Sequence, residues 1–434
     1  MSRDYIETGV EWINSIPNNW KLLKVKNCFY ISKKKAQAKN PTILKLARDA
    51  VKVRDISTNE GQIAASYDDY NPVFPGDFLL NPMDLYSGAN CNVSEVEGVI
   101  SPAYINLRKT RELNPKYFDY YFKVQYWTMA MFAHGKGVSF DNRWTINAEG
   151  MKNYEIPFPN IDEQNKIVAV INEKCSQIDE LIAIQEQEIE KLKAYKQSLI
   201  TEVVTKGLDP NAEMKNSGVD WITEIPKNWK TKPIKTLFTF SKGLSITKDN
   251  LQETGAAVIS YGQIHAKWNS GITLHEELKR YVSESYFESG VTSLAHKGCF
   301  IFADTSEDLT GCGNCAYVDK DEAVFAGYHT VILRPTQNID TKYLAYLFLT
   351  DAWRSQIRQR VYGIKLFSVT QKILKTLSVI IPDNCEPIVQ FLDKKCAHID
   401  SLVSMKEQKI SFLNEYRKSL IYEYVTGKKE VANG

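Results

Sequence analysis

The chain contains a long internal repeat, which limits its possible folds more than any other feature. Thirteen residues that start at Gly9 recur from Gly218 with nine identities, including two Trp residues in each copy. The segment 175–205 recurs as 396–426, with 15 of 31 positions identical. The offset is 209 for the first repeat and 221 for the second, so the intervening segment is longer in the second half. Each half therefore has a matching start, a divergent middle and a matching end.

The length of the chain agrees with two domains or more. At 434 residues it exceeds the size at which a single hydrophobic core usually keeps growing. Its 43% hydrophobic and 24% charged residues are typical of a globular protein, so each half can bury a core of its own.

The matching ends of the two halves are predicted to be long helices. There is no Gly or Pro from Asp162 to Lys206, and Asp162 is the expected N-cap. Apolar residues recur at spacings of three and four, which form a heptad seam in both copies. The seam candidates are Ile178, Ile182, Ile189, Leu192 and Leu199 in the first copy, and Ile399, Val403, Ile410, Leu413 and Leu420 in the second.

Polar residues interrupt both seams at the same two places, Gln185/Lys406 and Lys196/Arg417. Two arrangements are compatible with this pattern. The helices can be independent, each on its own core, or they can pair with each other around a pseudo-two-fold axis. Matched seams in a duplicated chain favour antiparallel pairing, with the polar breaks exposed or bonded across the pair.

The divergent middles, 22–155 and 231–378, show the same succession of elements. Turns precede buried strands at 78–80 and 300–302, and further strands are expected at 101–108 and 326–334. Aromatic helices follow at 116–132 and 341–360, and each leads into a polar loop that contains Gly, at 135–143 and 361–368. The two middles are therefore expected to share a fold but not a surface.

These predictions combine into an α+β architecture. Two similar mixed α/β domains are separated and joined by two long antiparallel helices, a coiled-coil spacer with internal pseudo-two-fold symmetry. The expected boundaries are 1–160 for the first domain, 161–206 for the central helix, 207–382 for the second domain with its linker, and 383–434 for the last helix.

No catalytic or metal-binding residues are predicted. The chain lacks a GxxxxGK[ST] loop for nucleotide phosphates, and its six His residues form no recognisable triad or metal constellation with the carboxylates. Asn81-Pro82-Met83-Asp84 lacks the second Pro and the aromatic residue of an adenine methyltransferase motif. Cys312-Gly-Asn-Cys315 supplies only half of a structural zinc site, which favours reduced structural thiols.

Charge and cysteine usage give weaker indications. A net charge of +2 neither demands nor excludes a nucleic-acid partner, because acidic helices can mask basic loops. Eight scattered cysteines without a secretory signal lead us to expect a reducing, cytoplasmic compartment. No apolar run approaches the roughly 20 residues that a membrane span needs.

The polar loops carry residue types that suit phosphate anchoring and base-edge hydrogen bonds. The candidate DNA-binding residues are Arg54, Gln62, Lys136, Ser139, Asn142 and Arg143 in the first middle, and Tyr261, Gln263, His265, Tyr362, Lys365 and Ser368 in the second. The alternative for each is an ordinary solvated loop. The repeated Trp12, Trp20, Trp221 and Trp229 are surrounded by Ile and Pro, which favours packing anchors over base-stacking platforms.

Several motifs together resemble the type I restriction-modification specificity subunit, the HsdS family, over essentially the whole chain. They are the tandem Gly-Val-(Glu/Asp)-Trp-Ile-x-x-Ile-Pro-x-x-Trp segments, Ile156-Pro157-Phe158-Pro159, Ile380-Ile381-Pro382, Asp162-Glu163-Gln164 and the closing Tyr-x-x-Ser-Leu-Ile stretches. The second copy departs from the pattern at Asn384-Cys385-Glu386-Pro387, where the Glu-Gln pair is missing.

The resemblance implies a non-catalytic, DNA-binding subunit. In that family each variable domain recognises one half of a bipartite, asymmetric sequence in double-stranded DNA. The helices act as a spacer and dock two methyltransferase subunits, which bind S-adenosylmethionine and methylate adenine. An ATP- and Mg-dependent translocating nuclease subunit joins for restriction. Two alternatives remain open, a specificity subunit of a methylation-only system and a duplicated helical scaffold that does not bind DNA.

Overall fold

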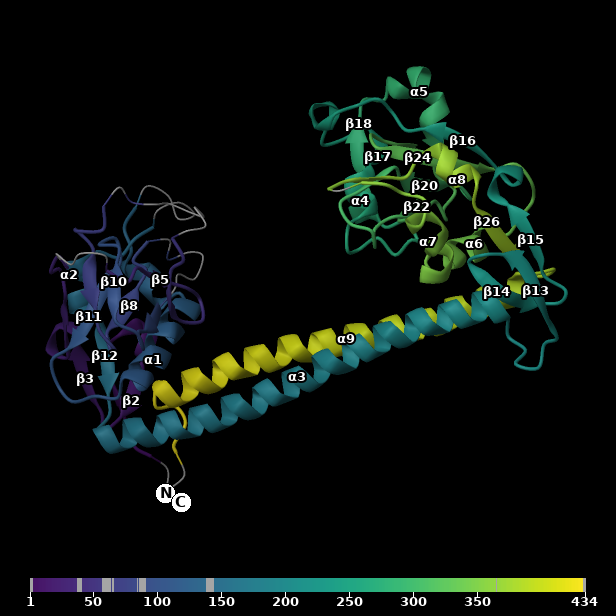
Figure 1. The fold of residues 1–434 in the computed structure, drawn as a ribbon. Helices are drawn as coiled ribbons and strands as arrows, with labels where there is room; N and C mark the ends of the chain where they lie inside the picture. Colours follow the sequence, from purple (N-terminus) through teal and green to yellow (C-terminus); the bar gives the residue numbers. More distant parts are fainter. Residues whose placement is uncertain are drawn as a thin grey trace. The chain divides into compact units, whose positions relative to one another are not determined.

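The chain folds into two compact units, each with the same plan. The computed structural model describes residues 3–36, 41–56, 64, 66–83, 85, 91–137, 144–363 and 365–431. Unit 1 comprises Met1–Glu186 with Glu407–Gly434, and unit 2 comprises Gln187–Lys406. In each unit a four-stranded antiparallel sheet has helices on one face and further strands on the other (Figure 1).

The central sheet of unit 1 alternates its side chains between two cores. Its strand order is β4 (Phe29–Ile31), β11 (Ile105–Lys109), β8 (Phe78–Leu80) and β9 (Cys91–Val93). Phe78 and Leu80 pack toward α1 (Pro115–Trp127), whereas Leu79 packs toward the small sheets. The other elements are β1 (Tyr5–Glu7), β2 (Ser15–Pro17), β3 (Lys21–Lys24), β5 (Leu44–Leu46), β6 (Val51–Val53), β7 (Asn71–Val73), β10 (Gly98–Ile100), α2 (Ala148–Asn153) and β12 (Glu155–Phe158).

Unit 2 repeats this arrangement. Its sheet order is β16 (Phe238–Lys242), β24 (Thr330–Pro335), β20 (Phe300–Ala303) and β22 (Cys315–Tyr317). Phe300 and Phe302 face α6 (Thr341–Phe348) and α7 (Asp351–Arg358), while Ile301 faces the second sheet. That sheet has the order β18 (Arg280–Val282), β17 (Ala256–Ile259), β23 (Val324–Ala326) and β19 (Leu294–Ala295). The other elements are β13 (Met214–Val219), β14 (Ile222–Pro226), β15 (Lys230–Pro233), α4 (Tyr261–Ile264), α5 (Tyr286–Ser289), β21 (Thr305–Ser306), β25 (Phe367–Ser368), α8 (Gln371–Lys375) and β26 (Ser378–Ile381).

The two long helices are α3 (Ile161–Lys206) and α9 (Glu386–Val425). The prediction of Asp162 as the N-cap of the first was wrong. Asn160 caps α3, since its side-chain oxygen accepts a hydrogen bond from the Glu163 amide at 2.9 Å. Asp162 instead lies in the first turn, where its negative charge is favourable at the positive end of the helix dipole.

The helices pair with each other in antiparallel fashion, as the matched seams predicted. In unit 2, Lys196 contacts Asp400 at 2.7 Å and Lys406 contacts Glu188. In unit 1, Arg417 contacts Asp179. The residue numbers rise along one helix as they fall along the other, which is the signature of antiparallel pairing. Three of the four polar residues that interrupt the seams therefore form ion pairs across the helices, and these pairs fix the register.

All ten predicted seam residues are buried or half-buried. Ile178, Ile189, Ile399 and Leu420 are buried, and the other six are half-buried. Burial of this row stabilises the pair, because each apolar side chain removed from water contributes favourably. The ion pairs, which lie nearer the surface, contribute mainly specificity of register.

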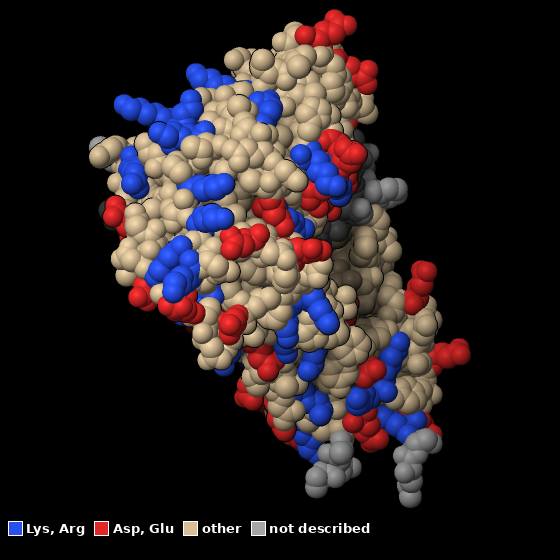
Figure 2. Space-filling view, turned by 90° about the vertical axis from the view of Figure 1, so that its right-hand side faces the viewer, with Lys and Arg blue, Asp and Glu red and all other residues tan. Residues whose placement is uncertain are grey.

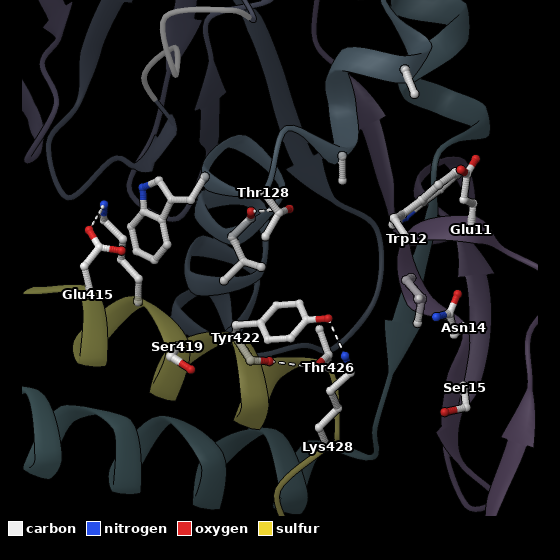
Figure 3. A pocket seen from close by; sticks show the side chains of 16 residues that line it. Glu11, Trp12, Asn14, Ser15, Thr128, Glu415, Ser419, Tyr422, Thr426 and Lys428 are labelled. Carbon is white, nitrogen blue, oxygen red and sulfur yellow. Dashed lines mark hydrogen bonds and ion pairs between the residues drawn. The ribbon is translucent and has the colours of Figure 1, made fainter.

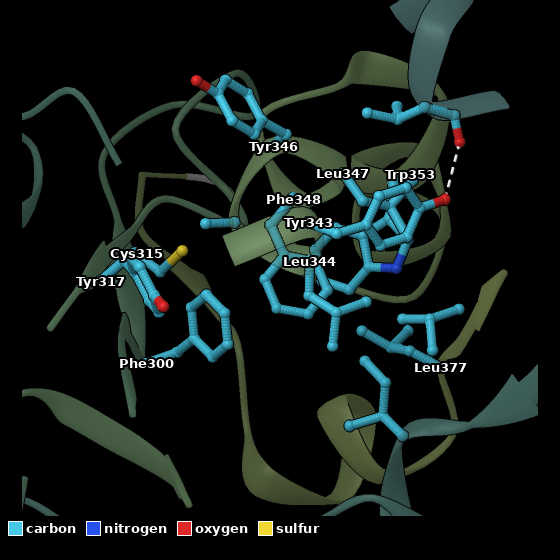
Figure 4. Close-up of a cluster of buried hydrophobic side chains, with 14 of the residues drawn as sticks. Phe300, Cys315, Tyr317, Tyr343, Leu344, Tyr346, Leu347, Phe348, Trp353 and Leu377 are labelled. Atoms are coloured by element: carbon cyan, nitrogen blue, oxygen red, sulfur yellow. Dashed lines mark hydrogen bonds between the residues drawn. The ribbon is translucent and has the colours of Figure 1, made fainter. Parts of the chain in front are cut away.

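A tyrosine in each unit holds the end of one long helix. The Tyr117 hydroxyl donates to the Val425 carbonyl of α9 at 2.9 Å, and the Tyr343 hydroxyl donates to the Val204 carbonyl of α3 at 2.9 Å (Figure 4). Val204 and Val425 are equivalent in the repeat, being 221 residues apart. Each sheet domain therefore packs on the end of the helix that the other half of the chain supplies.

The tryptophans act as packing anchors, as predicted. Trp20 and Trp229 are 3% and 4% exposed, and each lies edge-on to the tyrosine of its unit, at 6.4 and 6.2 Å between ring centroids. Trp12 and Trp221 are partly buried against the same two cores. None of these four rings is therefore presented as a free stacking surface.

Replacement of Tyr343 by Phe is expected to lower the free energy of unfolding by about 1 to 3 kcal/mol, because the buried Val204 carbonyl loses its hydrogen bond. Urea unfolding of the full chain measures this loss. Tyr362→Phe is the matched control, because Tyr362 is 86% exposed and its substitution should change stability by less than about 0.5 kcal/mol. Equal losses in the two variants would show that the buried hydrogen bond does not hold the helix end.

Several predicted element boundaries were wrong; among them, the strand expected over 326–334 begins only at Thr330. The helix expected at 341–360 is broken into α6 and α7, because the Thr350 hydroxyl accepts from the Trp353 amide at 3.2 Å and starts a new helix. The turn brings Trp353 into the core, where its indole N–H donates to the Ser378 carbonyl at 3.0 Å. In unit 1 the helix expected to reach residue 132 ends at Trp127, and the strand expected from residue 101 begins at Ile105.

Candidate nucleic-acid interface

Three of the predicted DNA-binding residues of unit 2 lie on or directly after one short helix. Tyr261 and Gln263 belong to α4, and His265 follows its last residue. The helix begins at Ser260, whose amide donates to the Gln263 side-chain oxygen at 3.1 Å. Gln263 therefore already serves as a capping residue, while Tyr261 and His265 line a pocket beside the helix.

His265 connects this helix to the loop 304–314. Its Nε2 lies 2.9 Å from the Thr305 carbonyl, and the Asn314 side-chain nitrogen lies 3.1 Å from its Nδ1. A carbonyl can only accept, so Nε2 carries the proton and Nδ1 accepts from Asn314. Both ring nitrogens are thus used within the domain, and His265 acts as a positioning residue for the loop.

The loop itself is held by a second set of hydrogen bonds. The Asp308 carboxylate accepts from the Thr310 hydroxyl and from the Gly311 amide, both at 2.6 Å. Arg358 of α7 donates to the Thr310 carbonyl at 3.0 Å. These bonds fix the loop against the rest of unit 2 before any ligand is present.

The loop and α4 enclose a pocket of about 540 Å³. Its lining residues are Tyr261, Gly262, His265, Ser306, Glu307, Asp308, Thr310, Gly311 and Asn314. The polar side chains are carboxylates, hydroxyls, an amide and the imidazole of His265, and no Lys or Arg lines the pocket among the described residues. Carboxylates accept hydrogen bonds from the exocyclic amines of bases and repel phosphates, so this pocket suits base edges better than the DNA backbone.

Sequence reasoning missed most of this pocket. Glu307, Asp308, Thr310 and Asn314 were not among the predicted residues. The signal was present in the polar turn sequence Asp308-Leu-Thr-Gly311, whose Asp side chain is suited to bond backbone amides ahead of it.

The predicted loop 361–368 reaches the same region through strand pairing. In β25, Ser368 pairs with Thr305 of β21, and the Val369 amide donates to the Asp304 carbonyl at 2.8 Å. Ser368, Lys365 and Tyr362 are exposed. The structure therefore brings Ser368 beside the loop that lines the pocket, whereas Tyr362 and Lys365 lie on the preceding segment and do not line it.

Unit 1 contains the same backbone pairing with different side chains. The Ile146 amide donates to the Pro82 carbonyl at 3.0 Å, and the Leu85 amide donates to the Trp144 carbonyl at 3.1 Å. This is the counterpart of the pairing between residues 304–306 and 367–369 in unit 2. Each unit thus pairs its own two segments in the same way, and the side chains on the equivalent segments differ between the units.

The predicted residues of unit 1 are only partly described. Lys136 is exposed, and its backbone exchanges two hydrogen bonds with Thr145, at 2.8 and 3.0 Å. Arg54 follows β6 and is half-buried, with its amide bonded to the Ile43 carbonyl at 2.8 Å. Gln62, Ser139, Asn142 and Arg143 lie outside the described residues.

A second hollow, of about 630 Å³, lies in unit 1 between residues 11–15, the end of α1 and the last turns of α9. Figure 3 shows Tyr422 and Ser419 of α9 on one side of it and Trp12 on the other. Lys428 donates to the Tyr422 hydroxyl, and Thr426 donates to the Tyr422 carbonyl at 2.6 Å. This hollow is built by the repeated segments and α1, not by the loops predicted to bind DNA.

The CxxC pair is structural. Cys312 and Cys315 are both buried free thiols. Burial raises the pKa of each, that of Cys315 to about 12, which keeps the thiols protonated near neutral pH. Among the described residues no three His, Cys, Asp or Glu side chains are grouped to hold a metal ion.

Charge on the surface is mixed. Figure 2 shows Lys and Arg side chains interspersed with Asp and Glu over the face that it draws, in keeping with the net charge of +2. In the part of the chain that the structure describes, no helix is both long and apolar enough to cross a bilayer.

Comparison with known proteins gives a consistent result. Residues 226–415 match the family model for the type I restriction modification DNA specificity domain. The type I restriction enzyme StySPI specificity subunit of Salmonella potsdam is 22% identical over 210 residues, which are 47% of this chain and 44% of that protein. The alignment thus spans less than half the length of this curated relative.

Solved structures resemble the chain over almost its whole length. One of them is a protein chain solved in a study of complex assembly and conformational transition of the type I R-M system. Its TM-score is 0.67 at 14% identity, and the superposition covers 95% of this chain and 99% of that one. The HsdS subunit from Thermoanaerobacter tengcongensis has a TM-score of 0.50 and 14% identity, with 95% and 98% covered. At these identities the likeness concerns the fold.

Proposed function

We propose that the protein reads a bipartite DNA sequence, because residues 226–415 match the family model for the type I restriction modification DNA specificity domain and the chain resembles an HsdS subunit in fold over almost its whole length. Each variable segment, within 1–160 and within 207–382, contacts one half-site. One observation supports this proposal most directly. Within each unit two backbone segments pair in the same way, residues 82–85 with 144–146 in unit 1 and residues 304–306 with 367–369 in unit 2. The side chains on these equivalent segments differ. A duplicated fold with two different surfaces is suited to read two different half-sites.

The candidate contacts follow from this proposal. In unit 2, the pocket around Tyr261 contacts base edges, and Tyr362, Lys365 and Ser368 contact the neighbouring bases or phosphates. In unit 1, Arg54 and Lys136 have the corresponding roles. The pocket has a carboxylate in Glu307 that is exposed and can accept from the amino group of cytosine or adenine.

The long helices α3 and α9 have two roles in the proposal. They set the spacing between the half-sites, and they dock two methyltransferase subunits. S-adenosylmethionine, ATP and Mg belong to those subunits and to the nuclease subunit, and this chain contributes recognition alone. The purified chain is expected to show no methyl transfer, ATP hydrolysis or cleavage.

Two alternatives predict different results. A specificity subunit that serves a methylation-only system gives the same DNA binding, and the neighbouring genes distinguish it by the absence of a nuclease subunit. A helical scaffold that does not bind DNA gives no salt-dependent affinity. For the assembled complex, the proposal predicts that affinity for duplex DNA falls steeply as salt rises, because bound phosphates release counterions.

Replacement of His265 by Ala is expected to weaken discrimination in the second half-site alone. The substitution removes the two hydrogen bonds by which this side chain positions the loop 304–314, so one base contact worth about 1 to 3 kcal/mol is lost, which is about five- to 150-fold in selectivity. Competition between DNA duplexes with single base changes in either half measures this in the assembled methyltransferase. His275→Ala, an exposed histidine of the same unit, is the control. Reduced selectivity in the first half-site would contradict the assignment of unit 2 to one half.

A further inference from the structure

The paired helices expose large apolar side chains that their own pairing does not use. In unit 1 these are Leu181, Ile184, Phe412 and Tyr416, between 43% and 70% exposed. In unit 2, Tyr195 and Met405 are 57% and 55% exposed. Single exposed apolar residues are ordinary, but a row of them that includes aromatic rings is typical of a protein-binding surface.

These residues form one patch in each unit. The ion pair between Asp179 and Arg417 sets the register in unit 1, and counting from it along antiparallel helices places Ile184 level with Phe412. Leu181 lies three residues from Ile184, and Tyr416 lies four from Phe412, so each pair shares a face of its helix. We define patch 1 as Leu181, Ile184, Phe412 and Tyr416.

The internal repeat generates the second patch. The residues equivalent to patch 1, at an offset of 221, are Leu402, Met405, Lys191 and Tyr195, which define patch 2. The register set by Lys196 and Asp400 places Met405 level with Lys191. A two-fold axis that exchanges antiparallel helices is perpendicular to the plane containing them, so equivalent residues of α3 and α9 face the same side of the pair.

The two patches differ in one decisive position. Phe412 of patch 1, the most exposed of its four residues at 70%, corresponds to Lys191 in patch 2. Leu181 and Leu402 are the same residue type, although Leu402 is half-buried where Leu181 is exposed; Tyr416 and Tyr195 are both exposed tyrosines, and Ile184 and Met405 are both large, apolar and exposed. A partner that binds both patches through the same surface therefore buries an aromatic ring in one complex and must accommodate an ammonium group in the other.

The proposed function has the long helices dock two methyltransferase subunits. Resting on that proposal, we infer that the two subunits contact patch 1 and patch 2, and that patch 1 binds more tightly than patch 2. Full burial of a Phe side chain stabilises an interface enough for a difference of at least about tenfold in Kd. The ammonium group of a lysine at the same place loses hydrogen bonds to water on binding, and an apolar partner surface offers it no replacement. The first methyltransferase therefore occupies patch 1, and the complex with a single copy accumulates before the second copy binds.

Titration of the full chain with the methyltransferase subunit, followed by native mass spectrometry, tests this. We expect the fraction of chain that carries one methyltransferase subunit to exceed the fraction that a binomial distribution over two equal, independent sites would give. Phe412→Lys makes the patches alike and should weaken the first binding step by about tenfold or more. Lys191→Phe should strengthen the second step by a similar factor. Lys193→Phe is the control, because it adds the same ring two residues away, about 200° around the helix.

The possible failures are distinguishable. If no methyltransferase binds, the proposed function is wrong. If two copies bind with a binomial distribution, or if Lys191→Phe weakens the second step, the inequality of the patches is wrong and the proposed function stands. If the chain alone forms a dimer that Phe412→Lys dissociates, the occupant of the patches is a second copy of this chain, and the inference is overturned.

Discussion

Four residues inserted into each long helix, after Gln187 and after Gln408, are expected to widen the gap between the two methylated half-sites by one or two base pairs. Each helix gains about 6 Å, at roughly 1.5 Å per residue. A base-pair step rises about 3.4 Å, so the gap grows while the bases of both half-sites stay the same. Both helices must be lengthened, because an insertion in α3 alone would move Lys196 away from Asp400.

The positions of the insertions preserve the three ion pairs described above between the two helices. Gln187 and Gln408 are equivalent in the repeat, being 221 residues apart. Asp179 and Arg417 lie on one side of the insertions, and Lys196 and Asp400 lie on the other. Four residues turn a helix by about 400°, which returns the distal part to nearly its original face.

Two residues inserted at the same places are expected to abolish assembly or recognition. They turn each helix by about 200°, so Leu192 and Leu199 face away from their partner and the seam is exposed. Mapping of methylated adenines after each insertion measures the outcome. Unchanged sequence and spacing in both variants would show that the helices do not set the gap.

Much of the fold could be predicted because the chain carries its pattern twice. The heptad seams predicted two long helices, and their shared polar breaks predicted the pairing that Arg417 and Lys196 complete with carboxylates of the other helix. The repeated Trp and Pro segments predicted packing anchors, which Trp20 and Trp229 are. Two copies of one weak signal are more informative than one copy.

The remaining features depend on contacts between distant residues. The break between α6 and α7 follows from the burial of Trp353 against Ser378, which is 25 residues further along the chain. The pocket of unit 2 depends on His265 reaching Thr305, 40 residues away. Local propensity carries no information about such pairs. The sequence therefore led us to predict His265 only as a DNA contact, and its role in holding a loop was not predicted.

Exchange of the first variable segment, 22–155, for that of a relative with a different specificity is expected to change one half-site completely. Unit 1 has its own core around the sheet β4-β11-β8-β9, and the second variable segment belongs to unit 2. The donor needs a tyrosine at the position of Tyr117, because this hydroxyl bonds the Val425 carbonyl at the end of α9. With that contact kept, the helices and the methyltransferase docking patches are unaltered.

The central claim, that each variable segment reads one half-site, is tested most directly by mapping methylated adenines across the host genome after this exchange. The account predicts a methylated sequence with a new first half, an unchanged second half and an unchanged gap. The matched exchange of 231–378 should give the complementary result. A change in both halves after a single exchange, or no change in either, would contradict the assignment of one reader to each unit.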